Sequence, residues 1–348
     1  MATASVDTAR AAAPAVFPGK TWQKLDRPEQ AGWSAEKLQA ARQSAEEFQS
    51  AAVMVVHRGK VVAEWGQTDR KYNVHSIRKS LLSALYGQQV KAGKIRLDDT
   101  LEKLGIDDNE PALTAAEKKA TVGDLLKARS GIYHPALYET EGMKRRRPVR
   151  GSHEPGTFWY YNNWDFNALG TIFQQATGQS VFVAFQRQIA EPIQMEDFRL
   201  EDGSFVRGED SIHPAYPFRM TARDMARFGL LFARGGRWRD RQVIPADWVR
   251  ESTQSYSEAV DGQGKQRGGY GYMWWTELGG LHVTNARLPP DTFSARGAGG
   301  HYILVVRAWD LVIVNRMDTD KKDGPRMENP QFGTLVQQIL DAMPPVRR

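Results

Sequence analysis

The sequence contains no cysteine among its 348 residues. A thiol nucleophile, a disulfide framework and a cysteine-ligated metal are therefore excluded. None of the seven histidines is spaced as in a His-x-x-x-His pattern, so we expect no metal site. No cofactor is expected either. No run of apolar residues is long enough to cross a bilayer, and no transmembrane segment is expected.

A strong charge of one sign is also missing. The 47 Lys and Arg residues stand against 41 Asp and Glu, which leaves a net charge of +6. The densest basic run, at residues 144–147, has no nucleic-acid recognition motif beside it and predicts a solvated loop. We therefore expect a small-molecule substrate and no nucleic-acid partner. The sequence does not predict an oligomeric state.

The first 19 residues are rich in Ala, Thr and Pro and predict a disordered segment. They lack the apolar stretch of a signal peptide. The alanine-rich run at residues 11–15 is what the mature form of an exported, periplasmic protein could begin with, so the compartment stays open.

Strand and helix patterns predict an α+β fold. Short, mostly apolar runs at 51–56 and 61–65, and again at 301–306 and 311–314, predict two hairpins, and the aromatic segment 270–275 predicts a further strand. Most of the chain between them has helical periodicity. We expect an antiparallel sheet built from residues 20–94 and 211–348, flanked by helices, with a mainly helical domain inserted at residues 95–210. The predicted helices cover residues 76–92, 121–126, 164–177, 220–232, 245–252 and 329–343.

The pattern Ser76-x-x-Lys79 opens the first of these helices. Residues three apart lie on one face of a helix. A lysine held in a partly dry site against a serine hydroxyl loses its proton more easily and can activate that hydroxyl. The chain holds a second such pattern, Ser34-x-x-Lys37, where Ser34 instead predicts an N-cap for an amphipathic helix.

Two further segments could complete a catalytic site. Tyr-x-Asn occurs twice in overlap, as Tyr160-x-Asn162 and as Tyr161-x-Asn163. A phenol can relay a proton, and an amide can hold a lysine or a substrate carbonyl. The glycine-rich segment 295–300 predicts a strand edge that a substrate can approach. Taken singly, each segment also fits a structural role, as aromatic core or as a glycine loop.

Taken in this order, the three motifs resemble the serine β-lactamase and penicillin-binding-protein superfamily. The resemblance is nearest to class C β-lactamase-like esterases and amidases, including 6-aminohexanoate-dimer hydrolases. It implies a β-lactamase/transpeptidase-like fold and hydrolysis of an ester or amide through an acyl-enzyme. It assigns Ser76 as nucleophile and Lys79 and Tyr161 as acid and base, with either of the two as the formal base, and Asn163 as the partner of Tyr161. The supporting segments are residues 93–99, 125–131, 155–157, 169–170, 219–229 and 270–275.

The resemblance also implies the substrate-binding groups. Backbone N–H groups at Gly297 or Ala298, beside that of Ser76, would hold an oxyanion. Tyr133 and Trp274 are candidates for an aromatic pocket.

The third motif departs from the family pattern, because Arg296 stands where β-lactam-processing enzymes carry a lysine. Arg296 either faces the cleft and selects anionic substrates or is turned outward by strand alternation. We expect the second, which leaves a neutral pocket. The alternatives in function are a β-lactamase or D,D-peptidase, and a catalytically silent module that binds peptide or cell wall.

Overall fold

A computed structural model describes residues 15–261 and 264–345. Residues 1–14, which include most of the expected disordered segment and most of the alanine-rich run, therefore lie outside the described residues. From Ala15 onward the chain packs on the body of the protein: the Val16 carbonyl accepts a hydrogen bond from Arg234 at 2.5 Å, and the Phe17 ring lies 5.3 Å from that of Trp238.

An eight-stranded antiparallel sheet forms the centre of the molecule, and both predicted hairpins belong to it. Its first strand in the sequence pairs with its last, with Ala52 opposite Arg316. In spatial order the strands are β2 (Lys60–Gly66), β1 (Ala52–His57), β14 (Leu311–Arg316), β13 (His301–Val306), β12 (Thr292–Gly297), β11 (Trp275–Thr276), β10 (Gln266–Tyr270) and β9 (Ser257–Val260).

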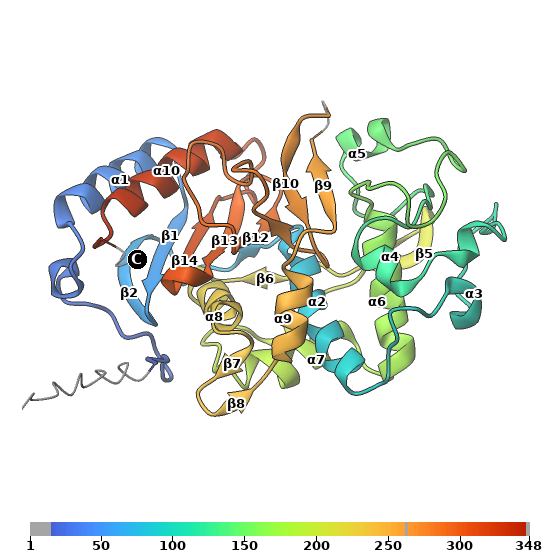
Figure 1. Cartoon of the computed structure of the whole chain (residues 1–348), viewed down its shortest axis with the longest axis horizontal. Coiled ribbons are helices and arrows are strands. Elements are labelled where there is room, and N and C mark those ends of the chain that lie inside the picture. The colour runs from blue at the N-terminus through green and yellow to red at the C-terminus, as the bar shows by residue number, and fades with distance from the viewer. Residues whose placement is uncertain (1–14, 262–263, 346–348) are drawn as a thin grey trace, which may run out of the picture.

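Helices cover both faces of this sheet. Figure 1 shows α1 (Ala35–Glu47) beside α10 (Asn329–Asp341) on one face. On the other face, α8 (Ala222–Ala233) packs on β1, β13 and β14, and α2 (Ile77–Lys91) packs on β12 and β13. Helix α8 approaches closely because Gly229 has no side chain: a Cβ there would lie 2.5 Å from the Val312 side chain. The expected antiparallel sheet flanked by helices is confirmed.

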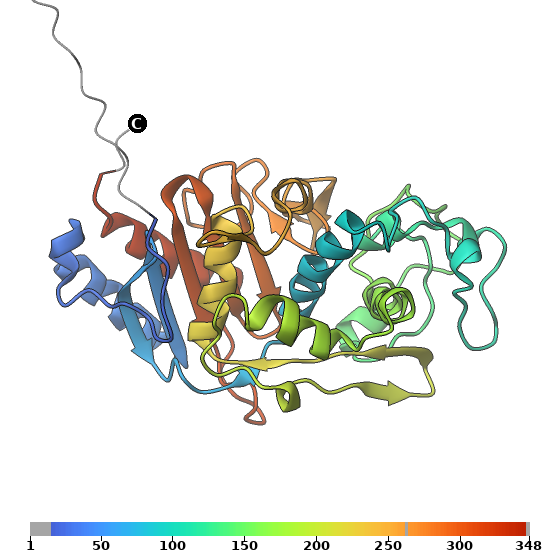
Figure 2. The same ribbon diagram turned by 90° about the horizontal axis from the view of Figure 1, so that it is seen from below.

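The chain between α2 and α8 lies to one side of the sheet (Figure 2). It includes one small hairpin, and a second short pair, β3 (Tyr72–Asn73) with β6 (Arg219–Met220), joins its two ends. No helix of the described residues is both long and apolar enough to cross a membrane. The elements of this region are α3 (Leu101–Leu104), α4 (Val122–Leu126), α5 (Glu141–Arg146), α6 (Asn163–Thr177), α7 (Val181–Phe185), β4 (Val206–Gly208) and β5 (Ser211–Ala215).

The aromatic segment 270–275 is not the single strand that its sequence predicts. Strand β10 ends at Tyr270 and β11 begins at Trp275, with Met273 between them at a φ of 61°. The Gly271 N–H donates to the Trp274 carbonyl at 2.8 Å, which closes a tight turn. A side chain at Gly271 would lie 2.2 Å from a backbone oxygen. The close approach of the backbone therefore requires a glycine where the aromatic pattern predicted a continuous strand.

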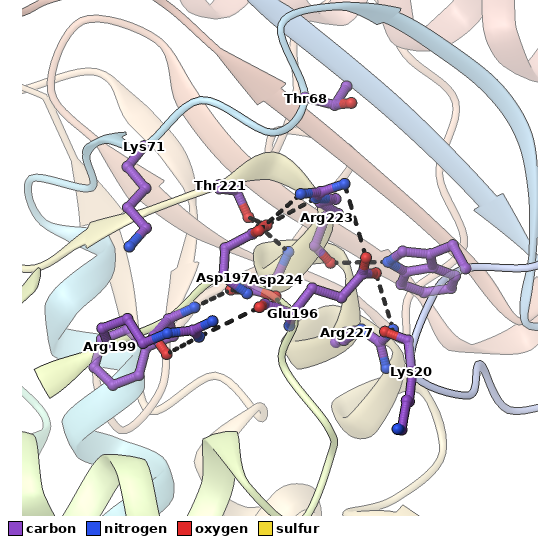
Figure 3. Close-up of polar contacts among 12 residues, drawn as sticks. Lys20, Thr68, Lys71, Glu196, Asp197, Arg199, Thr221, Arg223, Asp224 and Arg227 are labelled. Atoms are coloured by element: carbon purple, nitrogen blue, oxygen red, sulfur yellow. Dashed lines mark hydrogen bonds and ion pairs between the residues drawn. The ribbon is translucent and has the colours of Figure 1, made fainter.

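A cluster of charged side chains fastens the return of the chain to the sheet at the start of α8 (Figure 3). The Asp224 carboxylate accepts three consecutive backbone N–H groups beginning at Glu196, at 2.7, 3.0 and 2.8 Å. Arg223 binds Asp197 through two hydrogen bonds of 2.7 Å, and Arg227 binds Glu196 at 2.9 Å. Burial, followed by the charge of Asp197, raises the pKa of Asp224 to about 6. The segment 219–229 of the family pattern therefore has a structural role.

Candidate active site

Ser76 and Lys79 meet at the start of α2. Ser76 is half-buried and directly precedes the first residue of the helix. The Lys79 amine lies 2.8 Å from the Ser76 hydroxyl oxygen. Lys79 itself is only 2% exposed. The spacing of three residues therefore places a buried amine in hydrogen-bonding contact with a hydroxyl that solvent can reach.

The surroundings of Lys79 favour its neutral form. Burial, followed by repulsion from Arg78, holds the pKa of the Lys79 amine well below its usual range. Its nitrogen lies 4.6 Å from the centre of the Tyr161 ring and 4.9 Å from that of Phe166. Within the described parts of the chain no carboxylate forms an ion pair with Lys79. A neutral amine has a lone pair and can accept the proton of a hydroxyl.

The two adjacent tyrosines point to different places. The Tyr161 hydroxyl lies within hydrogen-bonding reach of the Ser76 side chain, and burial raises the pKa of Tyr161 to about 12. Tyr161 therefore carries its proton at neutral pH. The Tyr160 hydroxyl instead donates to the Met143 carbonyl at 3.1 Å, away from Lys79. The structure thus brings the second tyrosine of the overlapping motif, and not the first, to the Ser–Lys pair.

Buried hydrogen bonds fix the position of Tyr161. The next residue, Asn162, caps α6 and donates to the Asp165 carboxylate at 2.8 Å. Ser130 donates to the same carboxylate at 2.5 Å. Burial raises the pKa of Asp165 well above its usual range. Asn163 donates to the Tyr138 carbonyl at 2.8 Å, while its own side-chain oxygen is buried with no hydrogen-bond partner among the described residues.

The glycine-rich end of β12 lies against the residues that precede Ser76. A Cβ on Gly297 would be 2.5 Å from the Val74 carbonyl oxygen and 3.4 Å from the His75 Cβ. Ala298, the next residue, is exposed. Over residues 15–261 and 264–345, neither the Ser76 nor the Ala298 backbone N–H donates to another backbone group. Both N–H groups therefore lack a backbone acceptor among the described residues.

A directed chain of hydrogen bonds holds His75, which has a left-handed φ of 49°. Arginine can only donate, so Arg316 Nε gives its proton to His301 Nδ1 at 2.9 Å. The other His301 nitrogen then donates to the Thr319 hydroxyl at 3.1 Å, and Thr319 donates to His75 Nε2 at 2.8 Å. Burial and Arg316 lower the pKa of His75 to about 4. The neutral ring is thereby anchored next to Ser76, in a backbone conformation that non-glycine residues rarely adopt.

Arg296 is held by contacts within the protein, so the expectation of an outward side chain is corrected. Its guanidinium donates to the Ser294 hydroxyl at 3.0 Å and to the His282 carbonyl at 2.5 Å. It also lies 4.9 Å from the centre of the Trp275 ring. Burial lowers the pKa of Arg296 to about 10. These neutral partners hold the guanidinium in place, and among the described residues no carboxylate forms an ion pair with it.

Two expected pocket residues lie elsewhere. Trp274 is fully buried, and its ring lies 4.5 Å from that of Phe232 in the core beneath the sheet. The Tyr133 hydroxyl contacts His153 Nδ1 at 3.1 Å, and among the described residues no hydrogen bond joins it to Ser76 or Lys79. Trp275, next along the chain, instead packs 5.4 Å from Tyr161. The turn between β10 and β11 reverses which tryptophan faces the tyrosine.

A pocket of about 530 Å³ opens beside Tyr161. None of the described residues form a group of three or more His, Asp or Glu side chains that could hold a metal ion. The sequence did not indicate that Phe158 and Val260 would line this pocket, because a loop and the end of β9 bring them there from distant parts of the chain. The lining residues are Met143, Arg146, Phe158, Trp159, Tyr160, Tyr161, Val260, Asp261 and Trp275.

Comparison with known proteins gives one family and several similar folds. Residues 35–337 match the family described as Beta-lactamase. A Bacillus anthracis protein assigned to the 6-aminohexanoate-dimer hydrolases superposes with a TM-score of 0.65 at 19% identity, covering 95% of this chain and 89% of that one. A family VIII carboxylesterase gives 0.65 at 17%, covering 88% and 97%. A β-lactamase from Mycobacterium bovis gives 0.62 at 20%, covering 87% and 97%.

Proposed function

Because this chain belongs to the Beta-lactamase family, we propose that it is a serine hydrolase that cleaves an ester or amide bond of a small molecule through an acyl-enzyme. The observation that carries the proposal is the 2.8 Å contact between a buried Lys79 amine and the Ser76 hydroxyl. A structural lysine would have a carboxylate partner or reach solvent, and Lys79 does neither.

In the proposed mechanism Ser76 Oγ attacks the substrate carbonyl carbon and passes its proton to the neutral Lys79 amine. The backbone N–H groups of Ser76 and of Ala298 or Gly297 donate to the oxyanion that forms. The Tyr161 hydroxyl gives its proton to the departing oxygen or nitrogen and regains one from Lys79. The bond to the leaving group breaks, and the acyl group remains on Ser76.

Deacylation reverses these transfers. Water attacks the acyl carbonyl, its proton passes to the Tyr161–Lys79 pair, and the Ser76 oxygen recovers a proton as the acid departs. The pKa values favour Lys79 over Tyr161 as the group that first accepts the serine proton, since the amine pKa is lowered while the phenol pKa is raised to about 12.

The test is Ser76→Ala, assayed with p-nitrophenyl esters and small amides and by mass spectrometry after a fluorophosphonate. We expect turnover and the covalent adduct to disappear while the thermal unfolding midpoint stays unchanged. Ser34→Ala is the matched control: Ser34 caps α1 by accepting from the Lys37 N–H at 3.3 Å. It should keep full activity and cost about 1 kcal/mol of stability. Ester turnover by Ser76→Ala within a few-fold of the unmodified protein would disprove the mechanism.

Assays of the unmodified protein with further substrates and inhibitors distinguish the alternative functions. A β-lactamase would hydrolyse nitrocefin in preference to esters, and a D,D-peptidase would release D-alanine from a D-Ala-D-Ala peptide. A silent binding module would fail to form an adduct with either a fluorophosphonate or a boronate. The replacement of the family's third-motif lysine by Arg296 favours an esterase or amidase over a dedicated β-lactamase.

A further inference from the structure

The pocket beside Tyr161 has the size and shape of a subsite. Its volume of about 530 Å³ exceeds several-fold the roughly 150 Å³ cavity that encloses one benzene ring. Tyr161 is shared between this pocket and the Ser–Lys pair, because its hydroxyl lies within hydrogen-bonding reach of Ser76 and the residue also lines the pocket. A group lying in the pocket would therefore be attached close to the bond that Ser76 attacks.

The walls of the pocket are aromatic and rigid. The Trp275 ring lies 5.4 Å from Tyr161 and 6.1 Å from Trp159. Phe158 is 40% exposed and Val260 is 38% exposed, although both are apolar and line the same hollow. Exposed apolar side chains grouped around a hollow indicate a ligand-binding surface. Flat aromatic walls are suited to aromatic or extended apolar groups.

Charge at the mouth of the pocket is unbalanced toward positive. Asp261 lines the rim but binds Arg267 at 2.8 Å. Arg146, at the end of α5, also lines the pocket and is exposed, and among the described residues no acid forms an ion pair with it. Its neighbours differ, because Lys144 and Arg147 pair with Glu141 and Glu139.

We propose that this pocket binds the leaving group of the substrate, and that this leaving group is an aromatic or extended apolar body with an anionic end that reaches Arg146. The inference rests on the proposed function and adds the substrate class. The leaving group is the half assigned to the pocket because Tyr161, which lines it, is the residue that protonates the departing atom.

The experiment uses acetate esters that differ only in the leaving group. Unmodified protein is assayed with ethyl acetate, with 4′-acetoxybiphenyl-4-carboxamide and with 4′-acetoxybiphenyl-4-carboxylate. We expect both biphenyl esters to have the lower KM, and the carboxylate to exceed the carboxamide in kcat/KM by about two- to fivefold, the range of a solvent-exposed ion pair. Val260→Trp should raise the KM of the biphenyl esters selectively by narrowing the pocket. Arg146→Gln should bring carboxylate and carboxamide to equal kcat/KM.

Arg145→Gln is the matched control, since Arg145 is exposed on the same helix and does not line the pocket. It should keep the preference for the carboxylate. An equal preference in Arg146→Gln and Arg145→Gln, or no advantage of biphenyl over ethyl esters, would overturn the inference. Titration of the product 4′-hydroxybiphenyl-4-carboxylate into Ser76→Ala measures binding without turnover. It therefore separates failure of the pocket assignment from failure of the proposed function. Weaker binding in the double variants with Val260→Trp or Arg146→Gln supports the pocket even without turnover, and unchanged binding refutes it.

Discussion

The adjacent residues Tyr160 and Tyr161 allow the catalytic geometry to be tested with two nearly identical substitutions. Tyr161→Phe removes only the hydroxyl that reaches Ser76, while the ring keeps its contacts with Trp275 and with the Lys79 amine. Loss of general acid–base catalysis lowers kcat by about 10² to 10⁴-fold. This corresponds to about 2.7 to 5.4 kcal/mol of transition-state stabilisation.

Tyr160→Phe removes a hydroxyl of the same chemistry one residue earlier. Its cost is the 3.1 Å hydrogen bond to the Met143 carbonyl, about 0.5 to 1.5 kcal/mol of folding stability. We therefore expect Tyr160→Phe to lower the free energy of unfolding slightly and to leave kcat within a few-fold of the unmodified protein. Tyr161→Phe should therefore lose activity, whereas Tyr160→Phe should lose a little stability and keep its activity.

The assay is initial-rate hydrolysis of p-nitrophenyl acetate over a range of substrate concentrations, with urea unfolding as the stability measurement. Because the Tyr161 ring stays in place, KM should change much less than kcat. A larger loss of kcat in Tyr160→Phe than in Tyr161→Phe would refute the assignment and show that the preceding residue is the catalytic tyrosine.

Three other predictions follow from the contacts described. The kcat/KM should rise with pH as Lys79 loses its proton and should level off well below pH 10. It should not fall again until Tyr161 ionises near pH 12, and a fall between pH 7 and 10 would argue against a neutral lysine base. Thr319→Val should slow fluorophosphonate labelling of Ser76 at an unchanged unfolding midpoint, while Thr319→Ser keeps the hydroxyl and the rate; equal rates would show that the chain to His75 has no positioning role. The pKa of Asp224 is raised to about 6 in the folded state, from an unfolded value near 3.8, so between these pH values the folded protein binds a proton that the unfolded chain does not. This group therefore makes the free energy of unfolding grow as pH falls from about 6 to 4, by up to about 1.4 kcal/mol per pH unit. Asp224→Asn should flatten this pH dependence in urea titrations, and an identical dependence in the variant would contradict the assignment.

The sequence predicted the framework of the fold because its signals are local. The hairpin of β1 and β2 follows from two short apolar runs on either side of a tight turn, and the cap at Ser34 follows from a serine before an amphipathic run. The Ser76–Lys79 contact depends only on helical spacing, and the structure places the two side chains together. These features need no knowledge of distant parts of the chain.

The remainder of the site depends on contacts between distant segments, which no local pattern encodes. The positions of Tyr138 and Thr319 beside the site are set by loops far from Ser76 in the sequence. Residues 274 and 275 are both tryptophan, and only the turn at Met273 decides which of them faces Tyr161. The partner of Arg296 is His282, in a loop that carries no recognisable motif.

The pairing of β1 with β14 has a consequence for how the protein is made. The N-terminal hairpin emerges from the ribosome long before Arg316, which pairs with Ala52, has been translated. Until then the β1 edge, whose residues are all buried in the finished sheet, has no strand to cover it. Contacts between such distant residues slow folding, and exposed strand edges favour aggregation. During translation the nascent chain should therefore depend on chaperones until its last strand emerges, and truncations before β14 should accumulate as insoluble protein.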